Sequence, residues 1–306
     1  MVRIGTRESP LAMWQAHTVQ DLCTSYNIPT EIVTTKSDGD IDLVTPLYAL
    51  GVTGIFTRTL DAALLRGEID CAVHSFKDVP YILAEGLQVA AVLERGSSGD
   101  VLVLREGIDY KTKGIKLATS SLRRRAQWLR HYPETEFCDV RGNIQTRLRK
   151  LNQGEFDGIF FAKAALERLG LLSSVPNIYD IDWMLPAPAQ GAVVVVCRKK
   201  DKEIYNVLRK LNHYMTYRCT HIEREFMHTL QGGCSAPIGA LVTHDETTGF
   251  NFKGIVAEAN GKNVVEIEKF NYHKGDRKES LGSYCASLAI EKGAKKIIDT
   301  FRAVAH

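Results

Sequence analysis

One short pattern occurs twice in this chain of 306 residues and limits how the chain can fold. Residues 64–70 read Leu-Leu-Arg-Gly-Glu-Ile-Asp, and residues 151–157 read Leu-Asn-Gln-Gly-Glu-Phe-Asp. Both are typical of a helix that stops at a glycine. Both run into an apolar segment, 71–75 and 159–162, that is typical of a strand in a sheet covered on both faces. The repeat favours two similar α/β lobes, with a chance recurrence of Gly-Glu-x-Asp as the alternative.

Two connections mark where the chain crosses between these lobes. Strands expected at 89–93 and 101–104 flank the polar segment 94–99, and the segment 186–191, which contains two prolines, precedes an apolar strand at 192–197. We expect a first lobe at 1–94, completed by 191–210, and a second lobe at 95–190. Two crossings would form a hinged cleft, and open α/β sheets bind ligands where their strands end.

The last third of the chain has a different pattern. A helix expected at 220–230 is followed by strands near 238–243, 250–259 and 264–272, and Asn260-Gly261 is typical of a hairpin turn between the last two strands. We expect a small domain at 211–306 with a three-stranded antiparallel sheet. The fold class is therefore α/β, with two lobes of mixed or parallel sheets covered by helices, plus a C-terminal α+β domain.

Composition excludes several classes of protein. Hydrophobic residues make up 44% of the chain and charged residues 25%, as in ordinary globular proteins. The net charge of +3 is too small to indicate a nucleic-acid or membrane partner. The seven cysteines show no metal-ligand spacing, and their odd number argues against a disulfide framework. Since the sequence also shows no signal peptide or transmembrane run, we expect a cytoplasmic protein without a bound metal.

Arginines gather at three expected strand-to-helix turns. They are Arg7, the run Arg123, Arg124 and Arg125, and Arg141. Positive side chains in the first turn of a helix are unfavourable by up to roughly 1 kcal/mol each unless an anion is near. The run at 123–125 therefore predicts a bound carboxylate or phosphate group, with a solvated basic face as the alternative.

A cysteine lies in a short turn framed by glycines. Residues 230–239 read Leu-Gln-Gly-Gly-Cys-Ser-Ala-Pro-Ile-Gly. Gly232 and Gly233 lack Cβ atoms and can take positive φ, so a bulky group could lie against bare backbone. We interpret Cys234 as an attachment point just past a helix C-terminus, with an ordinary buried cysteine as the alternative.

An acidic residue follows the first of the two repeated strands. Residues 74–80 read His-Ser-Phe-Lys-Asp-Val-Pro. Lys77 and Asp78 could form a surface ion pair. At a strand end near arginines, Asp78 could instead stabilise positive charge that forms during a reaction and transfer protons. We interpret His74 as a core residue or as a residue behind the site.

Six groups of motifs occur in order between residue 3 and about residue 240. They are Thr-Arg-Glu-Ser-Pro-Leu-Ala at 6–12 with Trp-Gln-Ala at 14–16, Val-His-Ser-Phe-Lys-Asp-Val-Pro at 73–80, Thr-Ser-Ser-Leu-Arg-Arg at 119–124, Arg-Gly-Asn at 141–143 with Thr-Arg-Leu at 146–148, Gln-Gly-Ala at 190–192, and Gly-Gly-Cys at 232–234. Together they resemble the porphobilinogen deaminase family, also called the hydroxymethylbilane synthases. Beyond about residue 240 the chain is similar to the family in pattern only.

The resemblance implies two lobes like those of periplasmic binding proteins and a smaller third domain. It also implies a dipyrromethane cofactor, made from two porphobilinogen units and joined to Cys234 by a thioether, with Asp78 as the catalytic residue. Cofactor contacts map to Ser75, Lys77, Asp78, Thr119, Ser121, Arg123 and Arg124. Substrate contacts map to Arg7, Ser9, Gln15, Arg141, Asn143, Arg147, Arg168 and Gln190.

The reaction that the resemblance implies is the stepwise deamination and head-to-tail condensation of four porphobilinogen molecules, followed by hydrolytic release of the linear tetrapyrrole. Porphobilinogen carries acetate and propionate groups, which agrees with a site rich in arginine. The resemblance also implies a monomer that acts in porphyrin and heme biosynthesis. The alternative is a non-catalytic two-lobed protein, an anion-binding sensor or a solute-binding protein.

One loop departs from the family pattern. The family has a glycine-rich loop with a lysine before a phenylalanine, but residues 51–56 read Gly-Val-Thr-Gly-Ile-Phe, with Thr53 in place of the lysine. The next helix begins Thr-Arg-Thr at 57–59 and lacks the usual Lys-Glu pair. A lysine that could reach substrate carboxylates is therefore absent, although Arg58 could compensate.

Overall fold

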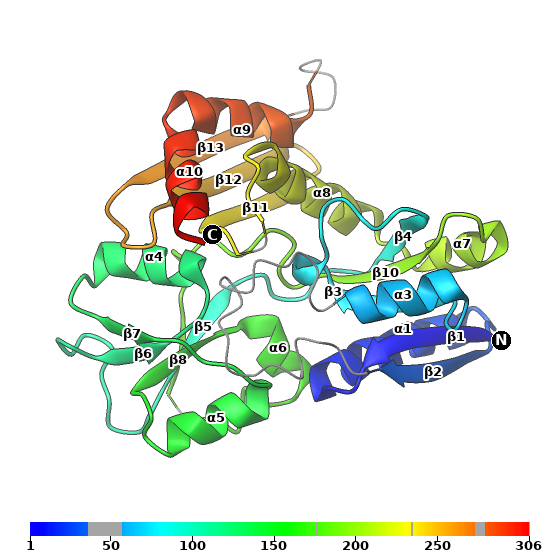
Figure 1. The fold of residues 1–306 in the computed structure, drawn as a ribbon, viewed down its shortest axis with the longest axis horizontal. Coiled ribbons are helices and arrows are strands. Elements are labelled where there is room, and N and C mark those ends of the chain that lie inside the picture. Colours follow the sequence, from blue (N-terminus) through cyan, green and yellow to red (C-terminus); the bar gives the residue numbers. More distant parts are fainter. Residues whose placement is uncertain (36–56, 176, 234, 273–278, 306) are drawn as a thin grey trace. The chain divides into compact units, whose positions relative to one another are not determined.

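A computed structural model describes the chain except for residues 36–56, 176, 234, 273–278 and 306 (Figure 1). The described residues form two compact units. Unit 1 consists of those up to Gly96 together with Gln190–Arg218, and unit 2 consists of Ser97–Ala189 together with Cys219–His306. The chain thus passes from one unit to the other after Gly96 and returns after Ala189, within the segments 94–99 and 186–191.

Unit 1 is built around a five-stranded sheet, called sheet A here, with the order β2-β1-β3-β10-β4 (Figure 1). β1 (Val2–Arg7) pairs in parallel with β2 (Thr30–Thr35) and with β3 (Cys71–Ser75). β10 (Val193–Arg198) runs antiparallel to β3 and to β4 (Leu87–Val92). The other elements among its described residues are α1 (Pro10–Ser25), α3 (Arg58–Arg66), α7 (Lys202–Leu208) and the short 3-10 helices η2 (Phe76–Asp78) and η3 (Arg209–Leu211).

Unit 2 contains a second five-stranded sheet, called sheet B, with the order β7-β6-β8-β5-β9. Its strands are β5 (Asp100–Leu104), β6 (Lys116–Ala118), β7 (Glu136–Cys138), β8 (Gly158–Ala162) and β9 (Ile178–Asp180). Its helices are α4 (Leu122–His131), α5 (Ile144–Asn152) and α6 (Lys163–Arg168). β6 pairs in parallel with β7 and β8, and β5 runs antiparallel to β8 and β9.

Sheets A and B have the same topology, which confirms the two similar lobes. β1, β2 and β3 correspond to β6, β7 and β8, and the antiparallel strands β10 and β5 correspond to each other. Each antiparallel strand is the first strand after a crossing, β5 after Gly96 and β10 after Ala189. The backbone N–H of Gly96 donates a 3.1 Å hydrogen bond to the carbonyl of Gly191, which joins the two connections.

The repeated Gly-Glu-x-Asp pattern has a structural cause. Its glycines, Gly67 and Gly154, have φ of 76° and 78°, a left-handed conformation that ends a helix at low cost when no Cβ is present. The Asp70 carboxylate accepts a 2.9 Å bond from the backbone N–H of Arg3 at the start of β1. The Asp157 carboxylate accepts a 3.0 Å bond from the N–H of Lys116 at the start of β6. The same aspartate therefore fixes the same pair of strands in each lobe, and the recurrence is not chance.

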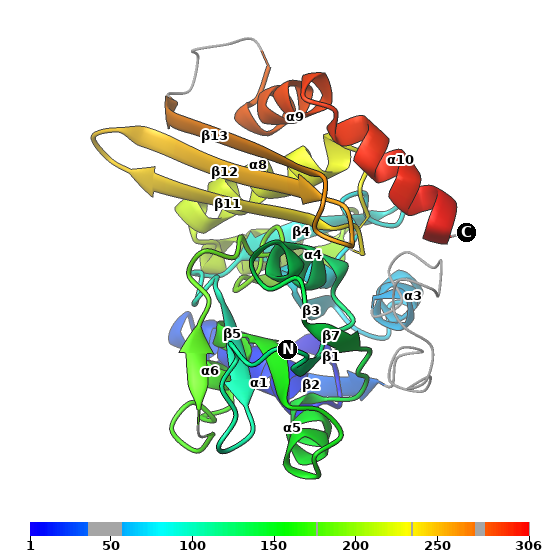
Figure 2. The same cartoon turned by 90° about the vertical axis from the view of Figure 1, so that its left-hand side faces the viewer.

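The C-terminal part of unit 2 contains a three-stranded antiparallel sheet, called sheet C, with the order β11-β12-β13 (Figure 2). Its strands are β11 (Ile238–Asp245), β12 (Gly249–Ala257) and β13 (Val264–Tyr272). The helices of this region are α9 (Leu281–Glu291), α10 (Ala294–Ala305) and α8 (Tyr214–Thr229), which begins in unit 1 and enters unit 2 at Cys219. Phe226 of α8 packs edge-on against Phe252 of β12 at 4.9 Å between ring centroids. The expected three-stranded sheet is confirmed.

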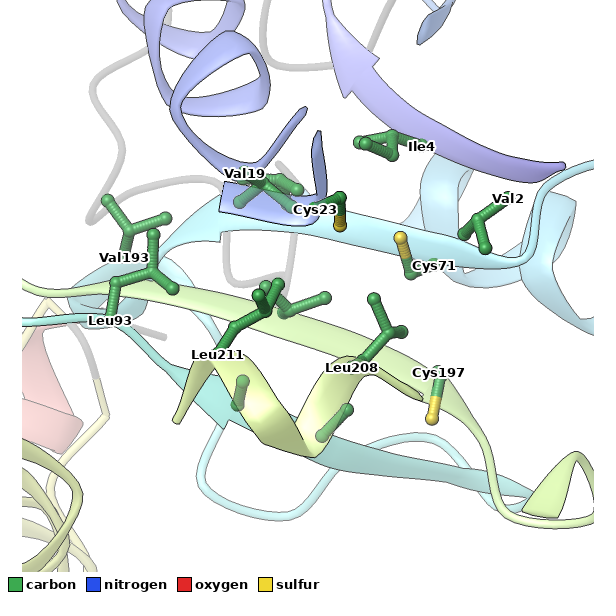
Figure 3. Close-up of a cluster of buried hydrophobic side chains, with 14 of the residues drawn as sticks. Val2, Ile4, Val19, Cys23, Cys71, Leu93, Val193, Cys197, Leu208 and Leu211 are labelled. Carbon is green, nitrogen blue, oxygen red and sulfur yellow. The ribbon is translucent and has the colours of Figure 1, made fainter. Parts of the chain in front are cut away.

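The sheets are covered by apolar side chains of the helices. On one face of sheet A, Val19 and Cys23 of α1 and Leu208 of α7 pack against Val73 and Val195 (Figure 3). In sheet B, alternate residues of β8 point to opposite faces: Ile159 and Phe161 share a cluster with α5 and α6, and Phe160 shares one with Trp128 of α4. Covered faces explain why both repeated strands are apolar along their whole length.

Candidate active site

The predicted site residues of unit 1 gather at one edge of sheet A. β1 and β3 run in parallel, so Arg7 and Ser75 end at the same edge. The side-chain amide of Gln15, which is 2% exposed, donates a 2.8 Å hydrogen bond to the Ser75 hydroxyl. Ser9 is the N-cap of α1, where its hydroxyl accepts from the N–H of Ala12.

Lys77 and Asp78 follow directly in η2, at the same edge. Lys77 Nζ donates a 3.3 Å hydrogen bond to Oε1 of the buried Gln190, whose backbone carbonyl accepts a 2.8 Å bond from Nε of Arg95. Asp78 is half-buried, and among the described residues its carboxylate forms no hydrogen bond or ion pair. Lys77 therefore contacts Gln190, and the Asp78 carboxylate remains available to a ligand.

His74 lies directly before these residues and is buried, as expected. Its ring is on the same strand as Ser75, and only 6% of the residue is exposed. Burial first, and the nearby positive charge of Arg7 second, lower the pKa of His74 to about 4. His74 is therefore a neutral, buried residue of β3 directly before Ser75.

The predicted site residues of unit 2 gather at the corresponding edge of sheet B. Thr119 and the α4 cap Ser121 follow β6, and the Thr119 hydroxyl accepts a 3.1 Å bond from the N–H of Ser121. Arg141 follows β7 and is 7% exposed. Both strands end in parallel at this edge, so these residues are brought to one side of the sheet.

The turn into α5 is built from the predicted Arg-Gly-Asn motif. Gly142 has φ of 104°, and an added Cβ there would lie 2.9 Å from Cγ2 of Thr146. The Asn143 side chain caps α5 by accepting a 2.9 Å bond from the N–H of Thr146. Arg147 Nε donates a 2.7 Å bond to the Gly142 carbonyl. Arg168 lies farther along, in the last turn of α6, and burial lowers its pKa.

A buried aspartate accounts for part of the anion that the arginine run predicted. Asp100, the first residue of β5, lies between the guanidinium groups of Arg123 and Arg124, at 2.7 Å from Nη1 of the first and 2.7 Å from Nη2 of the second. Arg125 pairs with Asp139 at 3.6 Å. The protein therefore supplies two carboxylates to this turn itself, and the bound anion that the arginine run predicts stays a prediction.

Asp100 was not among the predicted site residues. It lies at the start of a strand, and it is far along the chain from the arginines it contacts. One indication is present in the sequence: an aspartate opens the otherwise apolar strand Asp-Val-Leu-Val-Leu at 100–104. A buried charge is rare without a partner of opposite charge, so this residue could have been expected to pair.

Cys234 lies outside the described residues, but the turn before it is described. Gln231, at φ of 57°, is the left-handed residue after α8, and the N–H of Gly232 donates a 3.0 Å bond to the carbonyl of Met227. The positive φ therefore falls on Gln231, while neither Gly232 nor Gly233 has one. An added Cβ at Gly232 would lie 2.3 Å from Cδ1 of Ile238, so the buried Ile238 side chain would have to shift.

The other cysteines are poor candidates for attachment. All six that the structure describes are free thiols, and five of them are buried. Burial raises the pKa of Cys23 to about 11 and that of Cys285 to about 12, and it also raises the pKa of Cys71, Cys138 and Cys197. The Cys23, Cys71 and Cys197 side chains lie within the core of unit 1 (Figure 3). Thiols with raised pKa react slowly, because the thiolate is the nucleophile.

Two family models match this chain. Residues 2–206 match the model described as porphobilinogen deaminase, dipyromethane cofactor binding domain, and residues 217–291 match the one described as porphobilinogen deaminase, C-terminal domain. The porphobilinogen deaminase of Desulfitobacterium hafniense is 38% identical over 305 residues, which cover 98% of this chain and 97% of that protein. The probable porphobilinogen deaminase of Methanocaldococcus jannaschii is 44% identical over 247 residues, which cover 80% and 84%.

The chain belongs to the porphobilinogen deaminase family. Its function is that of a porphobilinogen deaminase, or hydroxymethylbilane synthase, a transferase of tetrapyrrole biosynthesis that uses a dipyrromethane cofactor. The family assignment confirms the predicted enzyme class and cofactor.

Solved structures also match, at low similarity. The VFT2 domain of Bordetella pertussis BvgS, as a double mutant, has a TM-score of 0.44 and 15% identity, and the match covers 73% of this chain and 89% of that one. The assignment of fold class depends instead on the sheets described above. Among the residues that the structure describes, no helix is both long and apolar enough to cross a membrane.

Proposed function

We propose that Asp78 is the catalytic residue of this porphobilinogen deaminase and that Cys234 carries its cofactor. Support for Asp78 comes from its place after β3, beside Ser75 and Lys77, and from a carboxylate that no described residue binds. A carboxylate at this position can stabilise the cation that remains when porphobilinogen loses ammonia, and it can accept protons from pyrrole nitrogens.

The residues of unit 2 fit a group that carries carboxylates. Arg123 and Arg124 place two buried positive charges against the single carboxylate of Asp100 at the edge of sheet B. Arg141 adds a third buried guanidinium at this edge. The acetate and propionate groups of a dipyrromethane are suitable anions for such arginines. When bound, the dipyrromethane supplies the pyrrole carbon to which the next substrate ring is joined.

The remaining predicted residues fall into two roles. Thr119, Ser121, Arg123 and Arg124 of unit 2, together with Ser75, Lys77 and Asp78 of unit 1, would hold the cofactor. Arg7, Ser9, Gln15 and Gln190 of unit 1, together with Arg141, Asn143, Arg147 and Arg168 of unit 2, would bind porphobilinogen. These arginines bind and orient carboxylates, and the covalent tether at Cys234 keeps the growing chain at high effective concentration between additions.

The proposed organisation has three domains. The lobes comprise residues 1–94 completed by 191–210, and residues 95–190, and the domain that carries Cys234 comprises residues 211–306. We expect the protein to act as a monomer in the cytoplasm. Thr53 of the departing loop lies outside the described residues, so the effect of the missing lysine stays a prediction.

The attachment is tested by the mass of the intact protein. Purified protein supplied with porphobilinogen should carry the mass of two pyrrole units, and it should give colour with an aldehyde reagent for pyrroles. The variant Cys234→Ser should show neither, whereas Cys138→Ser, a change at a cysteine that is partly accessible, should show both. An unmodified mass for the wild-type protein would favour the rival function, a two-lobed anion-binding sensor.

A further inference from the structure

The carboxylate of Asp100 holds both guanidinium groups of the proposed cofactor site. Nε and Nη2 of Arg124 donate to Oδ1 at 3.0 and 2.7 Å, and Nη1 of Arg123 lies 2.7 Å from Oδ2. The Asp100 side chain is 0% exposed, and the side chains of Arg123 and Arg124 are 4% and 10% exposed. Each guanidinium therefore pairs with its own carboxylate oxygen.

Further hydrogen bonds complete this arrangement. Arg123 Nη1 donates a 2.6 Å bond to the carbonyl of Leu185, and Arg124 Nη1 donates a 3.2 Å bond to the carbonyl of Phe160. Burial alone would raise the pKa of Asp100, but the two arginines outweigh it and hold that pKa well below its usual range. All three groups are thus charged at neutral pH, because arginine does not lose its proton in proteins.

The corresponding positions of sheet A show that the fold does not require these charges. Asp100 pairs with Ala162 in sheet B, and the equivalent pair in sheet A is Val193 with Ser75. The helix caps also correspond, since Ser121 accepts from the N–H of Arg124 and Ser9 accepts from the N–H of Ala12. Sheet A therefore has buried valine and alanine where sheet B has Asp100 and Arg124. The same topology forms without the ion pair.

The charges do not cancel, and one donor is left over. Two guanidinium groups against one carboxylate leave a net charge of one positive unit. Nε of Arg123 is buried and, among the described residues, has no hydrogen-bond partner. Buried donors are normally satisfied, so this one points to a ligand oxygen.

We propose that Asp100 is a positioning residue of the cofactor site, which orients Arg123 and Arg124 and limits their combined charge to one unit so that they receive one carboxylate group of the bound pyrrole chain. This inference rests on the proposed role of the two arginines. With no Asp100, the pair would carry two positive units in fixed surroundings. It would then favour a multiply charged anion, such as inorganic phosphate, over a single carboxylate.

The experiment compares Asp100→Asn with Asp100→Glu in the full chain. The first keeps the shape and removes the charge, and the second keeps the charge. The matched control is Asp157→Asn, which removes a carboxylate that pairs with Arg105 at 2.9 Å at the opposite edge of the same sheet. Each protein is assayed for pyrrole mass, for KM with porphobilinogen, and for inhibition by inorganic phosphate.

For Asp100→Asn we expect a lower pyrrole content or at least a tenfold higher KM, together with at least tenfold stronger inhibition by phosphate. Asp100→Glu should recover the phosphate resistance of the wild type, and Asp157→Asn should keep it. A purely structural role would not change the response to phosphate. Wild-type values for all three measurements in Asp100→Asn would overturn the proposal.

A second variant decides the question if Asp100→Asn does not fold. Asp100→Val with Arg124→Ala installs the residues that sheet A already accommodates and leaves one guanidinium, that of Arg123. A pyrrole content below that of Arg124→Ala alone would support the proposal, and a content equal to or above that of Arg124→Ala would overturn it. If the wild-type protein itself carried no pyrrole mass, the proposed cofactor attachment would fail, which is a different result from normal loading of the variants.

Discussion

Gln15 donates a 2.8 Å hydrogen bond from its side-chain amide to the hydroxyl of Ser75, and this bond joins the buried face of α1 to the last residue of β3. The two residues belong to different predicted roles, substrate binding for Gln15 and cofactor binding for Ser75. Because Gln15 is 2% exposed, it acts mainly through the orientation of Ser75.

Replacing Gln15 by methionine should separate this orientation from packing. Methionine fills a similar volume but cannot donate, so we expect a loss of about 1 kcal/mol in the free energy of unfolding and a severalfold rise in KM for porphobilinogen. The control is Gln20→Met on the same helix, where the amide donates a 3.3 Å bond to Thr30. Urea unfolding and steady-state kinetics measure both effects. Equal KM values for the two variants would show that Gln15 does not position Ser75.

Asp78→Asn should keep the cofactor and lose nearly all turnover. The amide has the shape of the carboxylate, but it can neither balance a cation nor accept a proton at neutral pH. Removal of one general acid–base group typically lowers rates by about 10²- to 10⁴-fold, and we expect kcat to fall within that range. Intact mass should still show two pyrrole units.

The matched control for Asp78 is Asp299→Asn, at an exposed position of α10. This change removes the same charge from the chain at a site with no predicted role, so kcat should stay at the wild-type value. If Asp78→Asn retained substantial turnover, Asp78 would lose its assigned role, and another proton acceptor would have to be found.

Much of the fold could be predicted because local patterns repeat. The glycines that end helices, the apolar strands and the Asn-Gly hairpin placed the strands that they predicted within a few residues of the observed bounds. α8 begins earlier than expected, at Tyr214, because its N-terminus is capped by a histidine: Nδ1 of His213 accepts a 3.2 Å bond from the N–H of Thr216. Histidine is not among the preferred N-cap residues, so the sequence did not indicate this helix start.

The site was predicted less completely, because its partners are distant in sequence. The motifs place the hydroxyl, amide and arginine residues, but a motif does not show that Asp100 lies between Arg123 and Arg124. The same limit applies to the Lys77 contact with Gln190, which joins residues 113 positions apart. Such contacts depend on strand order, and strand order follows from packing of the whole sheet rather than from local pattern.

His74 should make the stability of the protein depend on pH. Its pKa is lowered to about 4 in the folded state, whereas an unfolded histidine titrates near 6.5. Between these values the unfolded chain binds more protons, so stability falls as the pH falls through this range. The loss of folding stability that His74 causes is absent above pH 6.5 and reaches roughly 3 kcal/mol at pH 4 and below.

The variant His74→Phe tests this dependence, because it keeps a ring at the position and removes the titration. Relative to the wild type, it should gain roughly 2 kcal/mol of stability between pH 7.5 and pH 5, measured by urea unfolding. His17→Phe, at an exposed position of α1, is the control and should show no such gain. If the free energies of unfolding of the wild type and His74→Phe changed with pH in parallel, the prediction would be contradicted.

Gly232 and Ile238 should be energetically coupled, because the first residue has no room for a Cβ beside the second. An alanine Cβ at 232 would lie 2.3 Å from Cδ1 of Ile238 and 3.3 Å from Cβ of Ala236. Overpacking of this kind usually costs about 1–3 kcal/mol, and we expect Gly232→Ala to lose stability in that range. Gly233→Ala is the matched control, since its Cβ would meet nothing within 4 Å.

The coupling is measured with a double-mutant cycle in which Ile238→Val removes the clashing Cδ1 atom. By itself Ile238→Val should cost about 1 kcal/mol, but in the Gly232→Ala background it should restore stability, so that the two effects are not additive. Pyrrole content should be lower in Gly232→Ala and should recover in the double variant, because a displaced Gly232 moves the chain immediately before Cys234. If the changes in unfolding free energy of the two single variants were additive, the turn would accommodate the new Cβ by a shift that does not involve Ile238. Normal pyrrole content in an unstable Gly232→Ala would mean that attachment does not depend on the shape of this turn.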